Sequence, residues 1–122
     1  MINFKSHRVL LFISYLSIMI GNSFFSFINF PIKHLWRYDK CIHFAEYFIL
    51  GLLLFNVLYE NPVTQKKFIY YMIFITIIPI VDESIQFFIP YRIASFYDLL
   101  ADYTGAYLGC FLYYQINKGL NG

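Results

Sequence analysis

Long apolar runs separated by short polar segments dominate the hydrophobic pattern of the chain. Four such runs cover residues 9–27, 39–59, 68–88 and 97–116. Each is long enough to cross the roughly 30 Å hydrocarbon core of a bilayer as a helix. The pattern predicts an all-α polytopic membrane protein, an antiparallel bundle of four transmembrane helices that forms one domain over residues 1–122.

The segments between the runs carry signals that end helices. Residues 60–62 read Glu-Asn-Pro and stop the second helix, and residues 118–122 form a predicted polar tail after the fourth. Pro79, inside the third run, cannot donate a backbone hydrogen bond and predicts a kink one turn before Asp82.

The basic residues before the first run resemble the start of a signal peptide. Lys5 and Arg8 precede an uncharged stretch, but the first alanine of the chain is Ala45, so no Ala-x-Ala cleavage site follows the run. We interpret the run as a retained transmembrane helix.

Composition supports the membrane class. The chain is 60% hydrophobic and 13% charged, whereas soluble domains average about 25% charged residues. The lipid bilayer is therefore the expected partner, and Trp36 and Tyr38 are expected interfacial anchors. A net charge of +2 with scattered basic residues argues against nucleic acid. Cys41 and Cys110 have no zinc-site spacing and are predicted at different depths, so no disulfide is expected.

Orientation is encoded by the basic residues. With the N-terminus inside, the inner loops carry Lys5, Arg8, Lys66, Lys67 and Lys118, and the outer loops carry Lys33, Arg37, Lys40 and Arg92. Lys40 and Arg92 lie among carboxylates, and discounting both leaves an inner excess. The positive-inside rule then predicts cytoplasmic N- and C-termini.

Most polar residues of the runs lie at three helix ends that antiparallel spans place on one membrane face. They are Asp39, Lys40, His43, Glu46 and Tyr47 of the second run, Asp82, Glu83 and Gln86 of the third, and Asp98 and Asp102 of the fourth, with Arg92 in the loop between. Ionisable groups inside membrane helices must face partners or a water-filled cavity. We expect them to meet in one polar pocket near the outer face. Below it, Ala101, Gly105 and Gly109 have the spacing of a close helix-packing face.

Two segments carry a family resemblance. DKCIHFAEYFILGLLL and DESIQFFIPYRIASFYDLLADYTGAYLG, together spanning Asp39 to Gly109, resemble the VanZ-like family of small bacterial membrane proteins. The family pairs an Asp-Lys-x-x-His-Phe element with an Asp-Glu-x-x-Gln-x-x-x-Pro-x-Arg element. Two positions depart from it: Tyr91 stands where glycine is common, and Asp102 stands where asparagine is often found, which adds a potential negative charge.

The resemblance implies a multi-pass protein of the bacterial inner membrane that acts on the cell envelope. The namesake of the family is associated with resistance to the glycopeptide teicoplanin. The resemblance supplies no reaction, so whether the chain is an enzyme is left open.

Two chemical interpretations of the polar residues remain open. His43 would act as a general base oriented by a carboxylate, with Asp82, Glu83 and Asp98 as the other catalytic candidates, or it would be a structural histidine. Lys40 and Arg92 would hold a lipid phosphate, or Arg92 would form a salt bridge to Asp98 or Asp82. The remaining candidates for ligand binding are Tyr47, Gln86, Asp39 and Asp102. Glu46 is expected to pair with His43, one turn away.

A divalent cation is the one cofactor that the acids suggest. Carboxylates with one imidazole suit Mg²⁺, Mn²⁺ or Zn²⁺, but the spacing of Asp82, Glu83, Asp98 and Asp102 around His43 matches no metal signature. We therefore favour a hydrogen-bonded network closed by Lys40 and Arg92, in which one carboxyl group stays protonated.

The expected function is to bind or process a phosphate-bearing envelope lipid, or to contribute to teicoplanin-type resistance. The alternative is a non-catalytic membrane interaction or transport component whose polar network is structural. No nucleophile motif accompanies His43 and no phosphate-binding glycine loop is present, which favours non-covalent binding. The sequence does not encode an oligomeric state.

Overall fold

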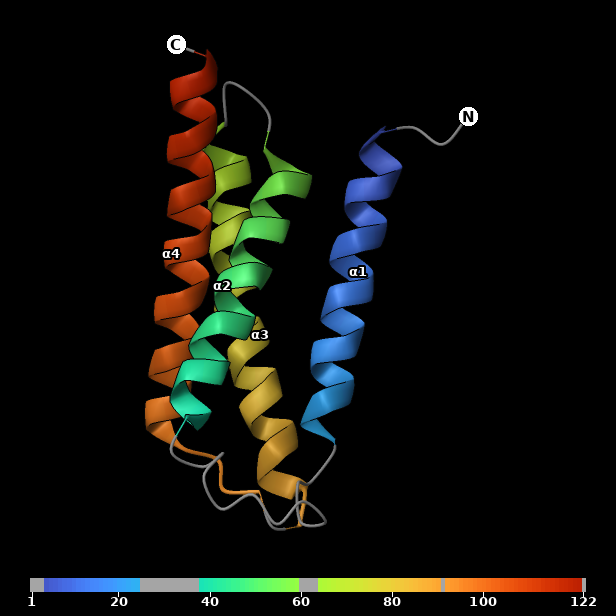
Figure 1. Ribbon diagram of the computed structural model, residues 1–122, viewed down its shortest axis with the longest axis vertical. Coiled ribbons are helices and arrows are strands. Elements are labelled where there is room, and N and C mark those ends of the chain that lie inside the picture. The colour runs from blue at the N-terminus through green and yellow to red at the C-terminus, as the bar shows by residue number, and fades with distance from the viewer. Residues whose placement is uncertain (1–3, 25–37, 60–63, 91, 122) are drawn as a thin grey trace.

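The computed structural model describes residues 4–24, 38–59, 64–90 and 92–121. They form four α-helices: α1 (Phe4–Ser23), α2 (Asp39–Leu58), α3 (Gln65–Phe88) and α4 (Phe96–Asn121). The helices run antiparallel in chain order, so the start of α1 and the end of α4 lie at the same end of the bundle (Figure 1). The all-α prediction is confirmed. Trp36, Tyr91 and residues 60–62 lie outside the described residues.

The helix boundaries differ from the predicted ones by a few residues. α1 begins at Phe4, before the apolar run, and α3 begins at Gln65, where the Thr64 hydroxyl accepts a hydrogen bond from the backbone N–H of Lys67. Such a cap satisfies one of the free N–H groups of the first turn. α3 continues through Pro79 to Phe88, and the kink stays a prediction.

The predicted polar tail is wrong, because α4 continues to Asn121. Lys118 lies in the last turn, where a cation is stabilised by the partial negative charge of the helix C-terminus. The Asn117 side chain donates to the carbonyl oxygen of Tyr113 at 2.9 Å, within the same helix. A polar, glycine-containing segment can therefore extend an established helix, since one glycine costs only about 1 kcal/mol there.

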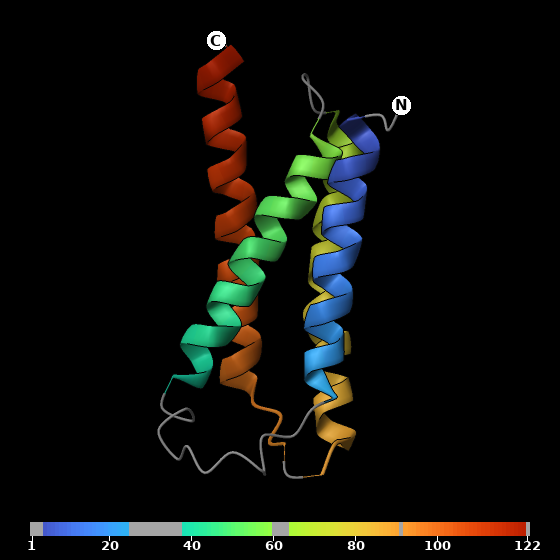
Figure 2. The same cartoon turned by 45° about the vertical axis from the view of Figure 1, so that its right-hand side comes forward.

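Glycine brings α2 and α4 into backbone contact. A Cβ atom at Gly51 of α2 would overlap the carbonyl oxygen of Ala106, and one at Gly105 or Gly109 of α4 would overlap that of Phe44 or Phe48. The predicted packing role of Gly105 and Gly109 is confirmed. α2 is inclined to α4, and the two diverge toward the end of the bundle where α4 finishes (Figure 2).

Aromatic residues fill the end of the bundle where α2 and α4 finish and α3 begins. The ring of Phe55 lies 5.7–6.3 Å, centroid to centroid, from those of Tyr59, Tyr71, Tyr113 and Tyr114. The Tyr71 hydroxyl donates to the Leu58 carbonyl oxygen. This cluster joins the end of α2 to the start of α3 and the end of α4.

The Tyr113 hydroxyl donates to Asn56 Oδ1 at 2.7 Å, and this bond gives a small, testable effect. Tyr113→Phe is expected to lower the free energy of unfolding by about 1 kcal/mol, the typical net contribution of one hydrogen bond. Denaturation in mixed detergent micelles measures it. Tyr114→Phe is the matched control, since its more exposed ring lies in the same cluster, and an equal loss in both variants would contradict the assignment.

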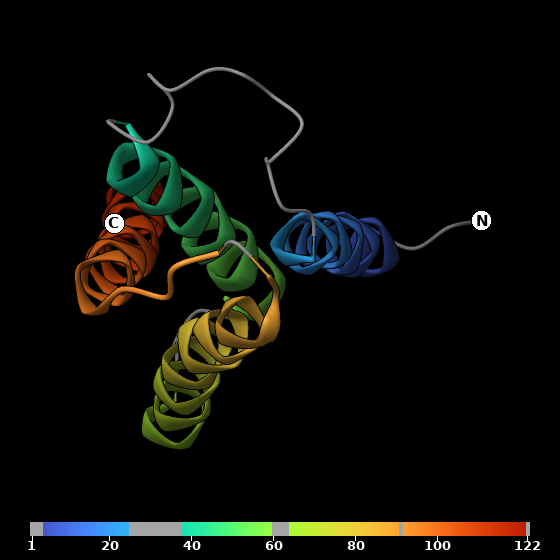
Figure 3. The ribbon, with the colours of Figure 1, turned by 90° about the horizontal axis from the view of Figure 1, so that it is seen from below.

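α1 lies to one side of the other three helices (Figure 3). Phe12 and Met19 are its buried apolar residues, and the Tyr15 hydroxyl donates to the backbone carbonyl of Glu46 at 2.9 Å. A cleft of about 400 Å³ lies along α1 beside its contact with α2, lined by Tyr15, Ile18, Met19, Gly21, Asn22 and Glu46.

Two of the described helices, α2 and α3, are long and apolar enough to cross a membrane. The core helix of a soluble protein can meet the same test, but it is mostly buried, whereas only about a third of the apolar window of α2 or α3 is buried. Large apolar side chains are exposed on all four helices, for example Ile18, Ile49, Ile77 and Leu108. That distribution favours an apolar solvent around the bundle.

Candidate functional site

Four helix ends meet at the end of the bundle that lies opposite the aromatic cluster; we call it the polar end. They are the end of α1, the start of α2, the end of α3 and the start of α4. Buried polar side chains gather there, namely Ser23, His43, Asp82, Gln86, Asp98 and Asp102. The structure thus brings together the candidates that the sequence placed at one membrane face and adds Ser23 to them.

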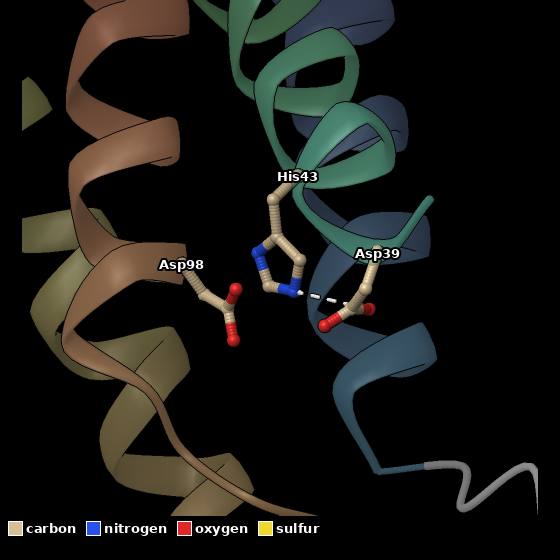
Figure 4. Close-up of side chains that lie close together, drawn as sticks. All are labelled: Asp39, His43 and Asp98. Carbon is tan, nitrogen blue, oxygen red and sulfur yellow. Dashed lines mark ion pairs between the residues drawn. The ribbon is translucent and has the colours of Figure 1, made fainter. Parts of the chain in front are cut away.

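His43 of α2 bridges two carboxylates. Its Nδ1 nitrogen forms a hydrogen bond with Asp102 Oδ1 of α4 at 2.8 Å, and its Nε2 nitrogen lies 3.9 Å from Asp39 Oδ1, one turn earlier on α2. Asp98 also lies close to the ring (Figure 4). Asp102 is fully buried and Asp39 is 38% exposed, so the stronger and drier contact is the one to Asp102.

Lys40 forms the ion pair that closes the start of α4. Its ammonium nitrogen lies 2.9 Å from Asp98 Oδ1, and its side chain is 55% exposed while that of Asp98 is buried. The sequence left open a salt bridge of Arg92 to Asp98 or Asp82 and indicated that Lys40 helps to close the network; in the structure Asp98 forms an ion pair with Lys40. Arg92 lies half-buried between α3 and α4, where its backbone N–H donates to the Ile89 carbonyl oxygen.

Asp82 of α3 accepts hydrogen bonds from three helices. Its donors are the Ser23 hydroxyl of α1, the Tyr47 hydroxyl of α2 at 3.1 Å and the Gln86 amide at 3.4 Å, one turn further along α3. Both carboxylate oxygens are therefore used. Sequence reasoning identified Tyr47 and Gln86 but missed Ser23. The signal was present, because the predicted topology places the end of the first helix on the same face.

The expected pairing of Glu46 with His43 is wrong. Glu46 Oε1 accepts from the Asn22 side chain of α1 at 3.3 Å, while the His43 ring is bonded to α4. Positions three residues apart differ by about 60° around a helix axis, since each residue turns it by 100°. α1 lies on one side of α2 and α4 on another, so the two side chains follow different neighbours.

Glu83 of α3 lies next to this network. Its Oε2 oxygen accepts from the backbone N–H of Ser95 at 3.3 Å, which holds the segment before α4 against the end of α3. One ligand atom each of Glu83, His43 and Asp102 lies within 4.8 Å of the other two, and the same holds for Asp39, His43 and Asp98. These two triads share the histidine. Cys41 and Cys110 are both free, as expected.

Residues 2–117, almost the whole chain, match the family model described as VanZ/LLP1. The chain belongs to the VanZ/LLP1 family. Members of this family are membrane proteins, which together with the span-length helices α2 and α3 places this VanZ/LLP1 protein in a bilayer. Neither a curated protein nor a solved structure matches the chain.

Membership in a membrane protein family makes a functional role of the polar cluster a stronger interpretation. In a soluble bundle, buried ion pairs such as that of His43 with Asp102 are ordinary structural features. In a membrane bundle, each ionisable residue within a helix is costly, and such residues concentrate at ligand sites and proton pathways. The cluster of this VanZ/LLP1 protein is therefore its best candidate for a functional site.

Proposed function

We propose that this VanZ/LLP1 protein uses the polar end of its bundle to bind a phosphate-bearing lipid of the cell envelope. The single observation that carries the proposal is the half-exposed side chain of Lys40, whose ammonium group is paired with Asp98 at the rim of a buried polar network. An ammonium has three N–H donors. Asp98 occupies one of them, which leaves the others to a ligand.

Arg92 supplies the second cation of the proposal. It lies in the short segment between α3 and α4, on the same end of the bundle as Lys40. A guanidinium group binds phosphate through a planar pair of N–H donors, and a flexible ammonium binds it as a point charge. One of each at a membrane surface suits a phosphate monoester or diester headgroup.

The proposal includes four membrane spans. α1 has 20 residues and α4 has 26, which correspond to about 30 and 39 Å at 1.5 Å per residue. Both are long enough for the hydrocarbon core. The positive-inside rule favours cytoplasmic termini in a bacterial inner membrane. With that orientation, the polar end of the bundle would lie at the outer face. A lipid site there would also serve to exclude a lipid-targeting antibiotic of the teicoplanin type.

Any catalysis at this site would be non-covalent with respect to the protein. Glu83 and Asp98 each offer a carboxylate oxygen within 4.8 Å of a ring nitrogen of His43, whereas Asp82 is bonded to Ser23, Tyr47 and Gln86. Proton transfer by His43 with Glu83 or Asp98 is the chemistry that these groups would support. Among the described residues, no serine or cysteine side chain is bonded to His43, since its ring contacts carboxylates. Binding is therefore the primary function that we propose.

Native mass spectrometry of gently solubilised protein tests the lipid proposal. We expect the wild type to retain a phosphate-bearing lipid, and Arg92→Ala and Lys40→Ala to reduce the retained fraction at least about tenfold. A hydrogen bond to a charged group contributes about 1.5–3 kcal/mol, and 1.4 kcal/mol corresponds to a factor of ten.

Arg8→Ala and Lys66→Ala are the matched controls, since each removes the same charge at the opposite end of the bundle. They are expected to leave the retained fraction unchanged. Equal lipid retention in all four variants would contradict the proposal.

One observation favours a structural role as the second candidate. Asp82 has a full set of donors from α1, α2 and α3, so part of the network joins helices rather than facing a ligand. A non-catalytic interaction or transport component would have such a network. Lipid-free wild-type protein that unfolds on substitution of Asp82 would support this candidate.

A further inference from the structure

Three helices direct one potential metal ligand each to the same point. His43 of α2, Glu83 of α3 and Asp102 of α4 offer ligand atoms that all lie within 4.8 Å of one another. We infer that these three residues bind a divalent transition-metal ion, Zn²⁺ or Mn²⁺. An imidazole with two carboxylates suits these ions, whereas Mg²⁺ prefers oxygen ligands alone.

Two carboxylate oxygens support the inference. Within the part of the chain that the structure describes, Asp102 Oδ2 and Glu83 Oε1 are buried and accept no hydrogen bond. Leaving a buried acceptor unsatisfied costs about 1–3 kcal/mol, and more for a charged group. Asp82, by contrast, has donors for both of its oxygens. The unsatisfied oxygens thus belong to the two acids of this triad, which a cation would satisfy together.

The geometry of His43 agrees with a role as ligand. Its Nδ1 nitrogen lies 2.8 Å from Asp102 Oδ1, and two ligand atoms bound at 2.0–2.2 Å to one ion lie about 3 Å apart. An ion bound to both of these atoms would replace the proton between them, and it would satisfy Oδ2 as well if Asp102 binds through both of its oxygens. Nε2 then faces Asp39 Oδ1 at 3.9 Å, and metal-bound histidines usually direct their other nitrogen to such a carboxylate.

Lys40 argues against the neighbouring triad of Asp39, His43 and Asp98. Its ammonium lies 2.9 Å from Asp98 Oδ1, so Asp98 is already neutralised and a second cation beside it would be repelled. Asp39 is also partly exposed to solvent. The charges of Glu83 and Asp102, in contrast, sum to zero with a divalent ion, which matters most where the surroundings have a low dielectric constant.

A metal ion at this point would also reduce an excess of negative charge within the polar cluster. Its carboxylates, Asp39, Asp82, Glu83, Asp98 and Asp102, outnumber its cationic groups and would repel an incoming phosphate. An ion held by Glu83 and Asp102 reduces that excess. The metal site itself does not depend on the lipid proposal, since it follows from protein ligands alone.

Metal binding to the purified, chelator-treated protein in detergent tests the inference. Titration calorimetry with Zn²⁺ or Mn²⁺ alone, followed by elemental analysis, is expected to give one equivalent per chain. Asp102→Asn and Glu83→Gln are expected to weaken binding more than about 100-fold, because loss of an outer-shell partner already costs 10- to 100-fold. Thermal unfolding of each metal-free variant shows that it is folded.

Asp98→Asn is the matched control, since it makes the same change at an equally buried position one turn earlier on α4. It is expected to keep the metal, as is Arg92→Ala, which separates this outcome from that of the lipid experiment. If Asp102→Asn fails to fold, the metal affinity of Glu83→Gln alone tests the inference, because Glu83 is only half-buried and its substitution disturbs the fold less. Absence of wild-type binding, binding unaffected by both ligand substitutions, or loss on Asp98→Asn only would overturn the inference.

Discussion

Substitution of His43 by alanine in chelator-treated protein is expected to lower the free energy of unfolding by about 3–5 kcal/mol. Among the described residues, the His43 ring is the hydrogen-bond partner of the Asp102 carboxyl group, at 2.8 Å. Without it, a fully buried carboxyl group loses its partner in a low-dielectric interior. Reversible denaturation in mixed detergent micelles measures the loss.

Two further variants separate this pair from its surroundings. His43→Leu combined with Asp102→Leu removes both polar groups, and replacement of a buried ion pair by apolar residues is often neutral or stabilising. The double variant is therefore expected to be more stable than His43→Ala. Asp39→Asn is expected to cost less than about 1 kcal/mol, since the contact of Asp39 with His43 is long and partly exposed. Equal losses in His43→Ala and Asp39→Asn would contradict this account.

Gly105→Val is expected to destabilise the bundle by about 3 kcal/mol, at the upper end of the usual cost of overpacking. A Cβ atom at Gly105 would overlap the Phe44 carbonyl oxygen and lie 3.0 Å from the Phe48 backbone nitrogen. These are backbone atoms of α2, which cannot rotate away as a side chain can. The helices must therefore separate, and the contact of His43 with Asp102 weakens with them.

Gly119→Val is the matched control on the same helix, because nothing lies within 4 Å of a Cβ atom there. Valine and glycine differ by only a few tenths of a kcal/mol in helix propensity, so little change is expected. Unfolding in mixed micelles compares the two variants. A Gly105→Val protein as stable as the wild type would show that α2 and α4 do not touch through this glycine.

Sequence reasoning located the polar cluster because two constraints were sufficient. Long apolar runs specify helices, and short loops between consecutive spans force alternate ends to the same face. Local pairs such as Asp82 with Gln86 then follow from a spacing of four residues. The contact of Gly105 with α2 follows from the small-residue pattern.

The partners across helices could not be predicted in the same way, because they depend on how far each helix is rotated about its axis. Helices that are apolar almost all round carry little information on that rotation. The sequence therefore paired Glu46 with His43, whereas Asn22 makes that contact. It also left the partner of Asp98 undecided, which in the structure is Lys40. Asn22 and Ser23 are uncharged, so the only signal for them was their position near the end of the first helix.

The backbone contact between α2 and α4 has a consequence for biosynthesis. The ribosome synthesises α2 well before α4, so Gly51 and His43 are made before the helix that they pack against. Asp82 can be satisfied by α1, α2 and α3 alone. His43 and Lys40, by contrast, have their carboxylate partners Asp102 and Asp98 on α4, so the site is complete only once the last helix in chain order has packed against the first three.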